Sequence, residues 1–281
     1  MGKFLIDPGP SRKGWHRLSK ALRCPRLYAL SYNKPRRTSD IPPAEPLIKG
    51  SLFHVGLAHH YGLQSTLYEG KDLYSPAESI QALAQLQPVG HRAAWQRYVP
   101  QMQETLAAYL LHWAAEQWKV EGIEHELCVN VYDEKMNDTY FYTQRVDLVW
   151  KHPITGKVWF VDHKTTNRFS SKTVGGYSMN GQFIGYQMIG EKMFGDQWGG
   201  VLLNVIEWGK GGASPTFNRM PIDPAPHSVA NFKTTIISAE RMIREFEDVE
   251  PSLWPATHHE SACWPYRKCR FYETCQWGSK T

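Results

Sequence analysis

Apolar side chains recur every three or four residues through most of the first 120 residues, the spacing that places them on one face of an α-helix. The segment 91–119 carries Trp95, Met102, Leu106 and Trp113 at this spacing. The helices that the pattern predicts in this half of the chain are 16–33 (interrupted at Pro25), 49–68, a short helix near 76–86, and 91–119. The segment 34–48 holds four prolines, which predict a loop.

The pattern changes after residue 120, where shorter apolar runs with alternation predict β-strands. Three strands are expected in succession, over 122–132, 141–150 and 157–164. A helix over 179–194, a buried strand over 200–208 and a helix over 226–248 follow. This order predicts an α/β protein in which a mixed central sheet is flanked by helices.

We expect one domain over 1–281, with a helical N-terminal elaboration and a cysteine-rich C-terminal tail. The expected parts are an N-terminal segment (1–48) with Cys24, a helical region (49–120), a sheet core (121–210), and a final helix with the cysteine cluster (226–281).

Composition narrows the class of protein only slightly. Hydrophobic residues make up 42% and charged residues 21% of the 281 residues, which is typical of a globular chain. The net charge of +5 is compatible with nucleic-acid binding but does not by itself indicate it. No apolar run reaches the length of a membrane span, and the first residues lack the long apolar stretch of a secretory signal. The expected location is therefore the cytoplasm, or the host cytoplasm if the protein is viral.

Charged residues with a chemical meaning lie in the predicted sheet. Asp162 and Lys164 are two residues apart on one strand, so both project from the same face. Asp147 lies on the preceding strand and can reach the same cavity. A lone Asp-x-Lys triplet is commonly a solvated ion pair, but the apolar run 158–161 that precedes it and the second carboxylate favour a metal site. Oxygen ligands of this kind suit Mg²⁺ or Mn²⁺.

Four short segments then resemble one known family, the PD-(D/E)xK nuclease superfamily, and within it the RecB-type branch, which includes the CRISPR adaptation nucleases and many phage exonucleases. The segments are Gly50–His54 (GSLFH), similar to a G-x-x-x-H helix; Arg145–Val149 (RVDLV), similar to the strand of the metal-binding Asp; Val161–Thr165 (VDHKT), similar to the D-x-K-T strand; and Gln182–Tyr186 (QFIGY), similar to the Q-x-x-x-Y helix.

The resemblance implies a restriction-endonuclease-like core and a role for each matching residue. It implies that Mg²⁺ or Mn²⁺ is bound by His54, Asp147, Asp162 and the backbone carbonyl of His163. Lys164 would be the catalytic lysine, and Gln182 and Tyr186 would contact DNA or steady the site. A strand carboxylate would support the centre, for which Glu124 and Glu126 both remain candidates. The family often has a glycine upstream of the metal-binding Asp where this chain reads Thr143-Gln144-Arg145, a departure that touches no ligand.

Cysteines form a second candidate site. Cys24, Cys263, Cys269 and Cys275 could hold zinc or an iron–sulfur cluster, or could remain free thiols. The five-residue gaps in the tail are wider than those of most structural zinc sites, which argues against zinc. The RecB-type resemblance implies a [4Fe–4S] cluster that joins the two ends of the domain, although the first gap is longer than in that group. Cys128 lies on a strand pattern and is expected in the core.

The sequence therefore predicts a metal-dependent DNA nuclease, an exonuclease on DNA ends or single strands in recombination, repair or phage DNA metabolism. A structure-specific endonuclease, a non-cutting nucleic-acid-binding subunit and a metal-bearing scaffold are the alternatives. DNA is the expected partner, and a recombination or replication protein is a possible second one. The residues that could contact phosphates or bases are Lys3, Arg12, Lys13, Arg17, Lys20, Arg23, Arg26, Arg267, Lys268 and Arg270, with Tyr28, Trp264, Tyr266 and Phe271.

Overall fold

Proline residues mark the first turn of several helices, because a helix tolerates a missing backbone N–H only there. In the computed structural model, Pro25 begins one helix and Pro46 lies in the first turn of another, which starts four residues earlier than expected. Pro100 also lies in a first turn, and the helix expected over 91–119 is consequently two helices, α5 (Val89–Gln96) and α6 (Val99–His112).

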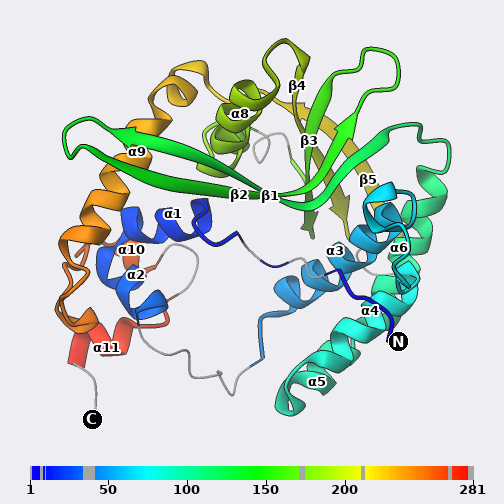
Figure 1. Ribbon diagram of the computed structural model, residues 1–281. Helices are drawn as coiled ribbons and strands as arrows, with labels where there is room; N and C mark the ends of the chain where they lie inside the picture. Colours follow the sequence, from blue (N-terminus) through cyan, green and yellow to red (C-terminus); the bar gives the residue numbers. More distant parts are fainter. Residues whose placement is uncertain are drawn as a thin grey trace. The chain divides into compact units, whose positions relative to one another are not determined.

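The structure describes residues 2–6, 9, 11–33, 42–170, 175–209, 213–264 and 268–277. Most of the loop expected over 34–48 lies outside these residues, as do Tyr266 and Arg267. The remaining helices are α1 (Trp15–Arg23), α2 (Pro25–Tyr32), α3 (Glu45–Leu63), α4 (Pro76–Leu86), α8 (Gly181–Phe194), α9 (Pro226–Glu245), α10 (Glu260–Cys263) and α11 (Tyr272–Trp277) (Figure 1).

Five strands form one mixed sheet in the order β1-β2-β3-β4-β5. They are β1 (Lys119–Asp133), β2 (Asp138–Lys151), β3 (Val158–Thr166), β4 (Trp198–Glu207) and β5 (Thr216–Ile222). Strand β3 is antiparallel to β2 and parallel to β4, and β4 is antiparallel to β5. The expected fold class, a mixed sheet flanked by helices, is confirmed. Strand β5 was not foreseen; its Pro221 is tolerated because β5 lies at the edge of the sheet.

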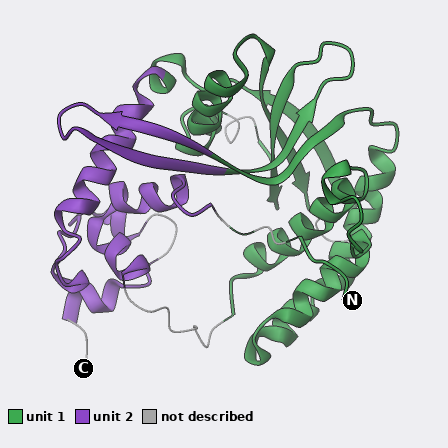
Figure 2. Ribbon diagram, viewed as in Figure 1, with its two compact units in different colours: residues 1–10, 39–127, 145–229 green, residues 11–38, 128–144, 230–281 purple. Residues whose placement is uncertain are grey.

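The chain forms two compact units (Figure 2). The first unit comprises residues 1–10, 39–127 and 145–229, and the second comprises 11–38, 128–144 and 230–281. In the first unit, α3, α4 and α6 build a core with the sheet that includes Phe53, Tyr61 and Trp150. In the second unit, Tyr28 of α2 and Trp254 are the centre of a smaller core, with ring centroids 5.7 Å apart.

Strand β3 is covered on both faces, and this sandwich decides where its polar residues point. Phe160 faces α8, where its ring lies 6.1 Å from that of Tyr186. Val161 faces the other way, into the core that α3 lines. Because side chains alternate along a strand, Asp162 shares the face of Phe160 and His163 shares the face of Val161. The acidic residue is thus turned toward α8 and the histidine toward α3.

Two further expectations concern exposure. Cys128 was expected in the core, but it is exposed on β1 because its neighbours Leu127 and Val129 are the residues turned inward. None of the described helices is long and apolar enough to cross a membrane.

The packing of α8 on β4 predicts a large effect at Gly190. A Cβ atom at this position would lie 2.4 Å from the ring of Trp198, which is buried and rigid. We expect Gly190→Ala to lower the free energy of unfolding by roughly 1–3 kcal/mol, the usual cost of overpacking. Gly90 on α5 has no atom within 4 Å of such a Cβ, so Gly90→Ala is the matched control and should not destabilise. Urea denaturation measures both; equal stabilities would contradict this packing.

Candidate active site

Two aspartates lie side by side on neighbouring strands. In the antiparallel register of β2 and β3, Leu148 pairs with Val161. The next position along the two strands therefore places Asp147 beside Asp162. Asp147 Oδ2 accepts a hydrogen bond of 2.6 Å from the backbone N–H of His163. The side chain of Asp147 therefore links β2 to β3 next to the last backbone pair, Leu148–Val161.

Helix α8 supplies the partners of Asp162, whose side chain is 1% exposed. Asp162 Oδ1 accepts hydrogen bonds from Gln182 Nε2 at 2.8 Å and from the Tyr186 hydroxyl at 3.3 Å. Gln182 and Tyr186 are four residues apart on one helix face, and they also contact each other. The Tyr186 hydroxyl reaches the carbonyl of Arg145 at 2.8 Å as well. Both α8 residues thus act on the aspartate directly.

Lys164 completes this cluster from the same strand. Its Nζ lies 2.6 Å from Asp162 Oδ2 and donates to Gln182 Oε1 at 3.3 Å. Burial by itself would lower the pKa of Lys164, but the carboxylates of Asp162 and Asp147 outweigh it and raise that pKa. Lys164 is therefore a charged ammonium group, partly buried, whose direction is fixed by two partners.

Residues of α3, β1 and β2 form a group that can bind a cation. One ligand atom each from His54, Glu124 and Asp147 can be chosen so that the atoms lie within 4.8 Å of one another. His54 Nδ1 on α3 is 3.6 Å from Asp147 Oδ2. Asp162 is not a member of this group; its carboxylate is engaged by Lys164 and α8. Two carboxylates and an imidazole are donors that fit a divalent cation such as Mn²⁺ or Mg²⁺.

The two glutamates that the sequence leaves open have different surroundings. Glu126 lies 3.6 Å from Arg145, in an ion pair. Glu124 belongs to the group with His54 and Asp147, and it has a positive φ of 46°. This left-handed conformation is costly for a residue with a side chain, and such strain is concentrated at functional sites.

Negative charge is crowded around Asp147. Burial raises the pKa of Asp147, and the nearby Asp162 raises it further, whereas His54 and Lys164 oppose the shift. The ionised form of Asp147 is thus held at a cost in the protein without a metal. A divalent cation would offset that cost, which is an independent sign that the site fits one.

His163 contributes more than a backbone group. Its side chain is buried, and its Nδ1 lies 2.7 Å from Asn204 Nδ2 on β4. Burial, followed by the electrostatic influence of His54, lowers the pKa of His163 well below its usual range, so the ring is neutral. The sequence reasoning missed Asn204, although a polar residue in the middle of the apolar run 201–206 was a visible signal.

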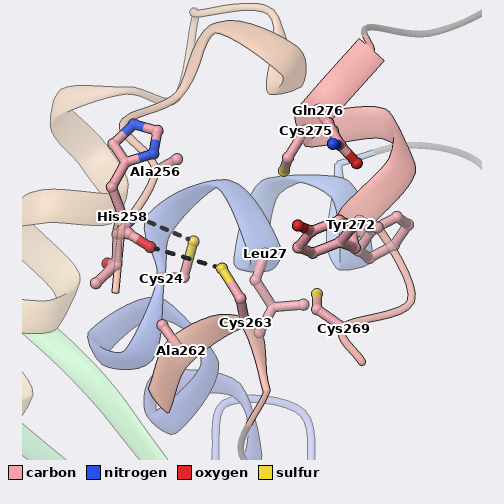
Figure 3. A pocket seen from close by; sticks show the side chains of 12 residues that line it. Cys24, Leu27, Ala256, His258, Ala262, Cys263, Cys269, Tyr272, Cys275 and Gln276 are labelled. Carbon is pink, nitrogen blue, oxygen red and sulfur yellow. Dashed lines mark hydrogen bonds between the residues drawn. The ribbon is translucent and has the colours of Figure 1, made fainter. Parts of the chain in front are cut away.

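The four expected cysteines line one cavity of about 300 Å³ in the second unit (Figure 3). Cys24 lies between α1 and α2, Cys263 ends α10, Cys269 follows it, and Cys275 lies on α11. Cys24 Sγ accepts a 3.5 Å hydrogen bond from the backbone N–H of Thr257. Cys128 does not line the cavity.

Several basic residues expected to contact phosphates are instead engaged in holding the second unit together. Arg17 forms a two-fold ion pair with Glu240, at 2.5 and 3.0 Å. The other such contacts are Arg23 to the carbonyl of Ala262, Arg26 to the carbonyl of Trp254, and Arg270 to the hydroxyl of Ser31. These arginines connect α1 and α2 to the C-terminal segment around the cysteine cavity.

The mixed sheet thus carries acidic side chains and a lysine on neighbouring strands, an arrangement that can hold a divalent cation. A model of the PD-(D/E)XK nuclease superfamily matches residues 15–277, and this chain belongs to that superfamily. A solved structure described as "Crystal structure of SSO0001" is 11% identical, with 84% of this chain and 87% of that chain covered and a TM-score of 0.33. No curated protein matches the chain.

The crowding around Asp147 predicts that Asp147→Asn stabilises the metal-free protein but removes the stabilisation that a metal gives. Asp147→Asn keeps an oxygen for the His163 N–H but removes the buried charge. In EDTA the variant should be more stable than the wild type, by about 1 kcal/mol, typical of one stabilising substitution. Because the pKa of Asp147 is raised in the folded state, the wild type loses stability as the pH rises through that pKa. The stability difference between Asp147→Asn and the wild type should therefore grow with pH.

Thermal unfolding across this pH range measures the difference. Added Mn²⁺ should raise the melting temperature of the wild type and not that of Asp147→Asn. An Asn variant less stable than the wild type in EDTA at every pH would contradict the assigned crowding.

Proposed function

We propose that this protein is a Mg²⁺- or Mn²⁺-dependent deoxyribonuclease of the RecB-type branch. The observation that carries the proposal is the convergence of His54, Glu124 and Asp147 beside a charged Lys164 that Asp162 and α8 hold in place. The family supports phosphodiester hydrolysis; the choice of DNA rests on the RecB-type sequence motifs.

Each residue has a distinct task in this proposal. By the resemblance, His54, Asp147, Asp162 and the carbonyl of His163 would hold the metal. Glu124, which lies with His54 and Asp147, would add a carboxylate to the set. A divalent ion at this position polarises the phosphodiester and lowers the pKa of bound water.

Lys164, fixed by Asp162 and Gln182, balances the charge that develops on the phosphate or orients the attacking water. Gln182 and Tyr186 keep Asp162 in one orientation, because both contact its Oδ1 atom. Their role is therefore to position the carboxylate rather than to carry the reaction.

The reaction we propose is exonucleolytic cleavage from DNA ends or of single strands. The support is the resemblance of the four motifs to a branch that contains many exonucleases. An endonuclease on the same fold would use the same residues, so the substrate assay has to separate the two activities.

Cleavage assays test this function. We expect linear duplex or single-stranded DNA to be degraded with Mn²⁺ or Mg²⁺ and not with EDTA, and closed circular DNA to be spared. Asp162→Asn keeps the shape of the side chain but should lower the rate by more than about 100-fold, since even outer partners of a metal site matter by 10–100-fold. Asp196→Asn, an exposed residue, is the matched control. Activity that survives EDTA or Asp162→Asn would refute the centre, and cutting of circles would indicate an endonuclease.

We further propose that Cys24, Cys263, Cys269 and Cys275 hold a [4Fe–4S] cluster with a structural role. Four thiols around one cavity are a donor set that fits such a cluster, and a backbone N–H directed at Cys24 Sγ is a common partner of cluster sulfurs. A site that joins residue 24 to residue 275 closes a loop of most of the chain and so restricts the unfolded state.

Chemical analysis tests the cluster. Protein purified without oxygen should be brown and contain close to four iron and four sulfide per chain, the content of one [4Fe–4S] cluster. Cys269→Ala should lose the colour and much of the soluble yield, whereas Cys128→Ala, exposed and outside the cavity, should keep both. A colourless wild type that contains zinc would overturn the cluster, and so would a metal-free wild type in which all five cysteines react as free thiols.

A further inference from the structure

A buried charge that the proposed chemistry does not use lies in the first unit. Arg219 on β5 has a side chain that is 9% exposed. Its Nη2 atom donates hydrogen bonds to Glu116 Oε2 and to the hydroxyl of Tyr109, both at 2.8 Å. Its guanidinium stacks 3.8 Å from the ring centre of Trp113 and 4.6 Å from that of Trp150. The group is therefore held rigidly among aromatic rings.

Stability alone is a poor explanation for this arrangement. Removing an arginine and a glutamate from water costs several kcal/mol per ion, and apolar residues of similar size often give equal or greater stability. A buried pair of this kind is better explained by something that it orients. The question is then which group the Arg219 side chain holds in place.

The strand registers give the answer. His163 of β3 pairs with Asn204 of β4, and Asn204 pairs with Arg219 of β5. The three residues thus form one row across three neighbouring strands. Asn204 Oδ1 accepts from Arg219 Nε at 3.4 Å, and Asn204 Nδ2 lies 2.7 Å from His163 Nδ1.

The chemistry of arginine fixes every orientation in this row. A guanidinium can only donate, so the oxygen of Asn204 must face Arg219 and its NH₂ group must face His163. Nδ1 of His163 is then an acceptor, and the ring proton lies on Nε2. The NH₂ group of Asn204 also donates to Tyr109 at 2.9 Å, so both of its hydrogens are used.

The row ends at the proposed metal centre. The backbone N–H of His163 binds Asp147 Oδ2, and its carbonyl is an expected metal ligand. The His163 ring contacts that of His54 edge-on at 5.7 Å and lies parallel to that of Tyr61 at 6.3 Å. A rotation of this ring would therefore disturb two proposed ligands and the carboxylate between them.

We propose that Arg219 and Asn204 are positioning residues of the metal centre, which act through the side chain of His163. This inference rests on the proposed function, since it assigns the row to the same metal site. Neither residue touches the metal or the DNA in this assignment; they set the direction of the groups that do.

Metal binding without DNA tests the inference. Mn²⁺ affinity is measured by titration calorimetry and by the electron paramagnetic resonance signal of free Mn²⁺, on the intact protein. Asn204→Leu has a similar volume but removes the contacts to both neighbours. Arg219→Lys keeps the charge opposite Glu116 but loses the N–H that holds Asn204. We expect both to raise the Kd for Mn²⁺ by roughly 10–100-fold, as outer-shell changes do.

Glu116→Gln is the matched control, because it alters the far end of the network and keeps the row from Arg219 to His163. It should lower the melting temperature while changing the Kd less than about 3-fold, within the usual scatter of such measurements. Folded Asn204→Leu and Arg219→Lys proteins that bind Mn²⁺ like the wild type would overturn the inference alone. A wild type whose Mn²⁺ binding is absent, or unchanged by Asp147→Asn, would instead overturn the proposed function.

Discussion

The crowding of two carboxylates, Asp147 of β2 and Asp162 of β3, is the constraint on which the site depends. Two buried carboxylates on neighbouring strands repel each other, so each needs hydrogen-bond donors or positive charge beside it. Asp162 is compensated by Lys164 and by donors from α8. Asp147 accepts one backbone N–H, and His54 and Lys164 stabilise its ionised form without a hydrogen bond to it. The asymmetry leaves Asp147 as the carboxylate with the most to gain from a cation.

The two helices that pack on the sheet, α8 and α3, each supply partners to a different one of these carboxylates. Helix α8 brings Gln182 and Tyr186 to Asp162, and its close approach to β4 is possible because Gly190 leaves room for Trp198. Helix α3 brings His54 to the other carboxylate. The strained backbone at Glu124 adds a third carboxylate from β1. Backbone strain at Glu124 and repulsion between buried carboxylates at Asp147 thus occur in one group of residues.

The proposed active-site residues all belong to the first unit, whereas the four cysteines belong to the second. The cysteine cavity is built from segments at both ends of the chain, and arginines such as Arg23 and Arg270 connect those segments. These contacts change how the basic residues of the N-terminal region are interpreted. Several of these arginines bind other parts of the second unit. The number of arginines in the sequence therefore overstates the positive charge that is available to bind phosphates.

The sequence by itself determined the class of fold, and it named the residues from which the proposed site is built. Hydrophobic periodicity predicted the long helices, with α5 and α6 as one, and four of the five strands. Alternation along β3 predicted that Asp162 and Lys164 share a face. Local rules suffice for these features, because side-chain direction in a strand or helix depends only on near neighbours in the chain.

The remaining features depend on contacts between residues far apart in the chain. Only the tertiary structure decided that Glu124 rather than Glu126 lies beside His54, that Cys128 points outward, and that β5 adds an edge strand. It also decided that the guanidinium of Arg219 lies two strands away from His163, because strand register is fixed by the whole sheet and not by either segment alone.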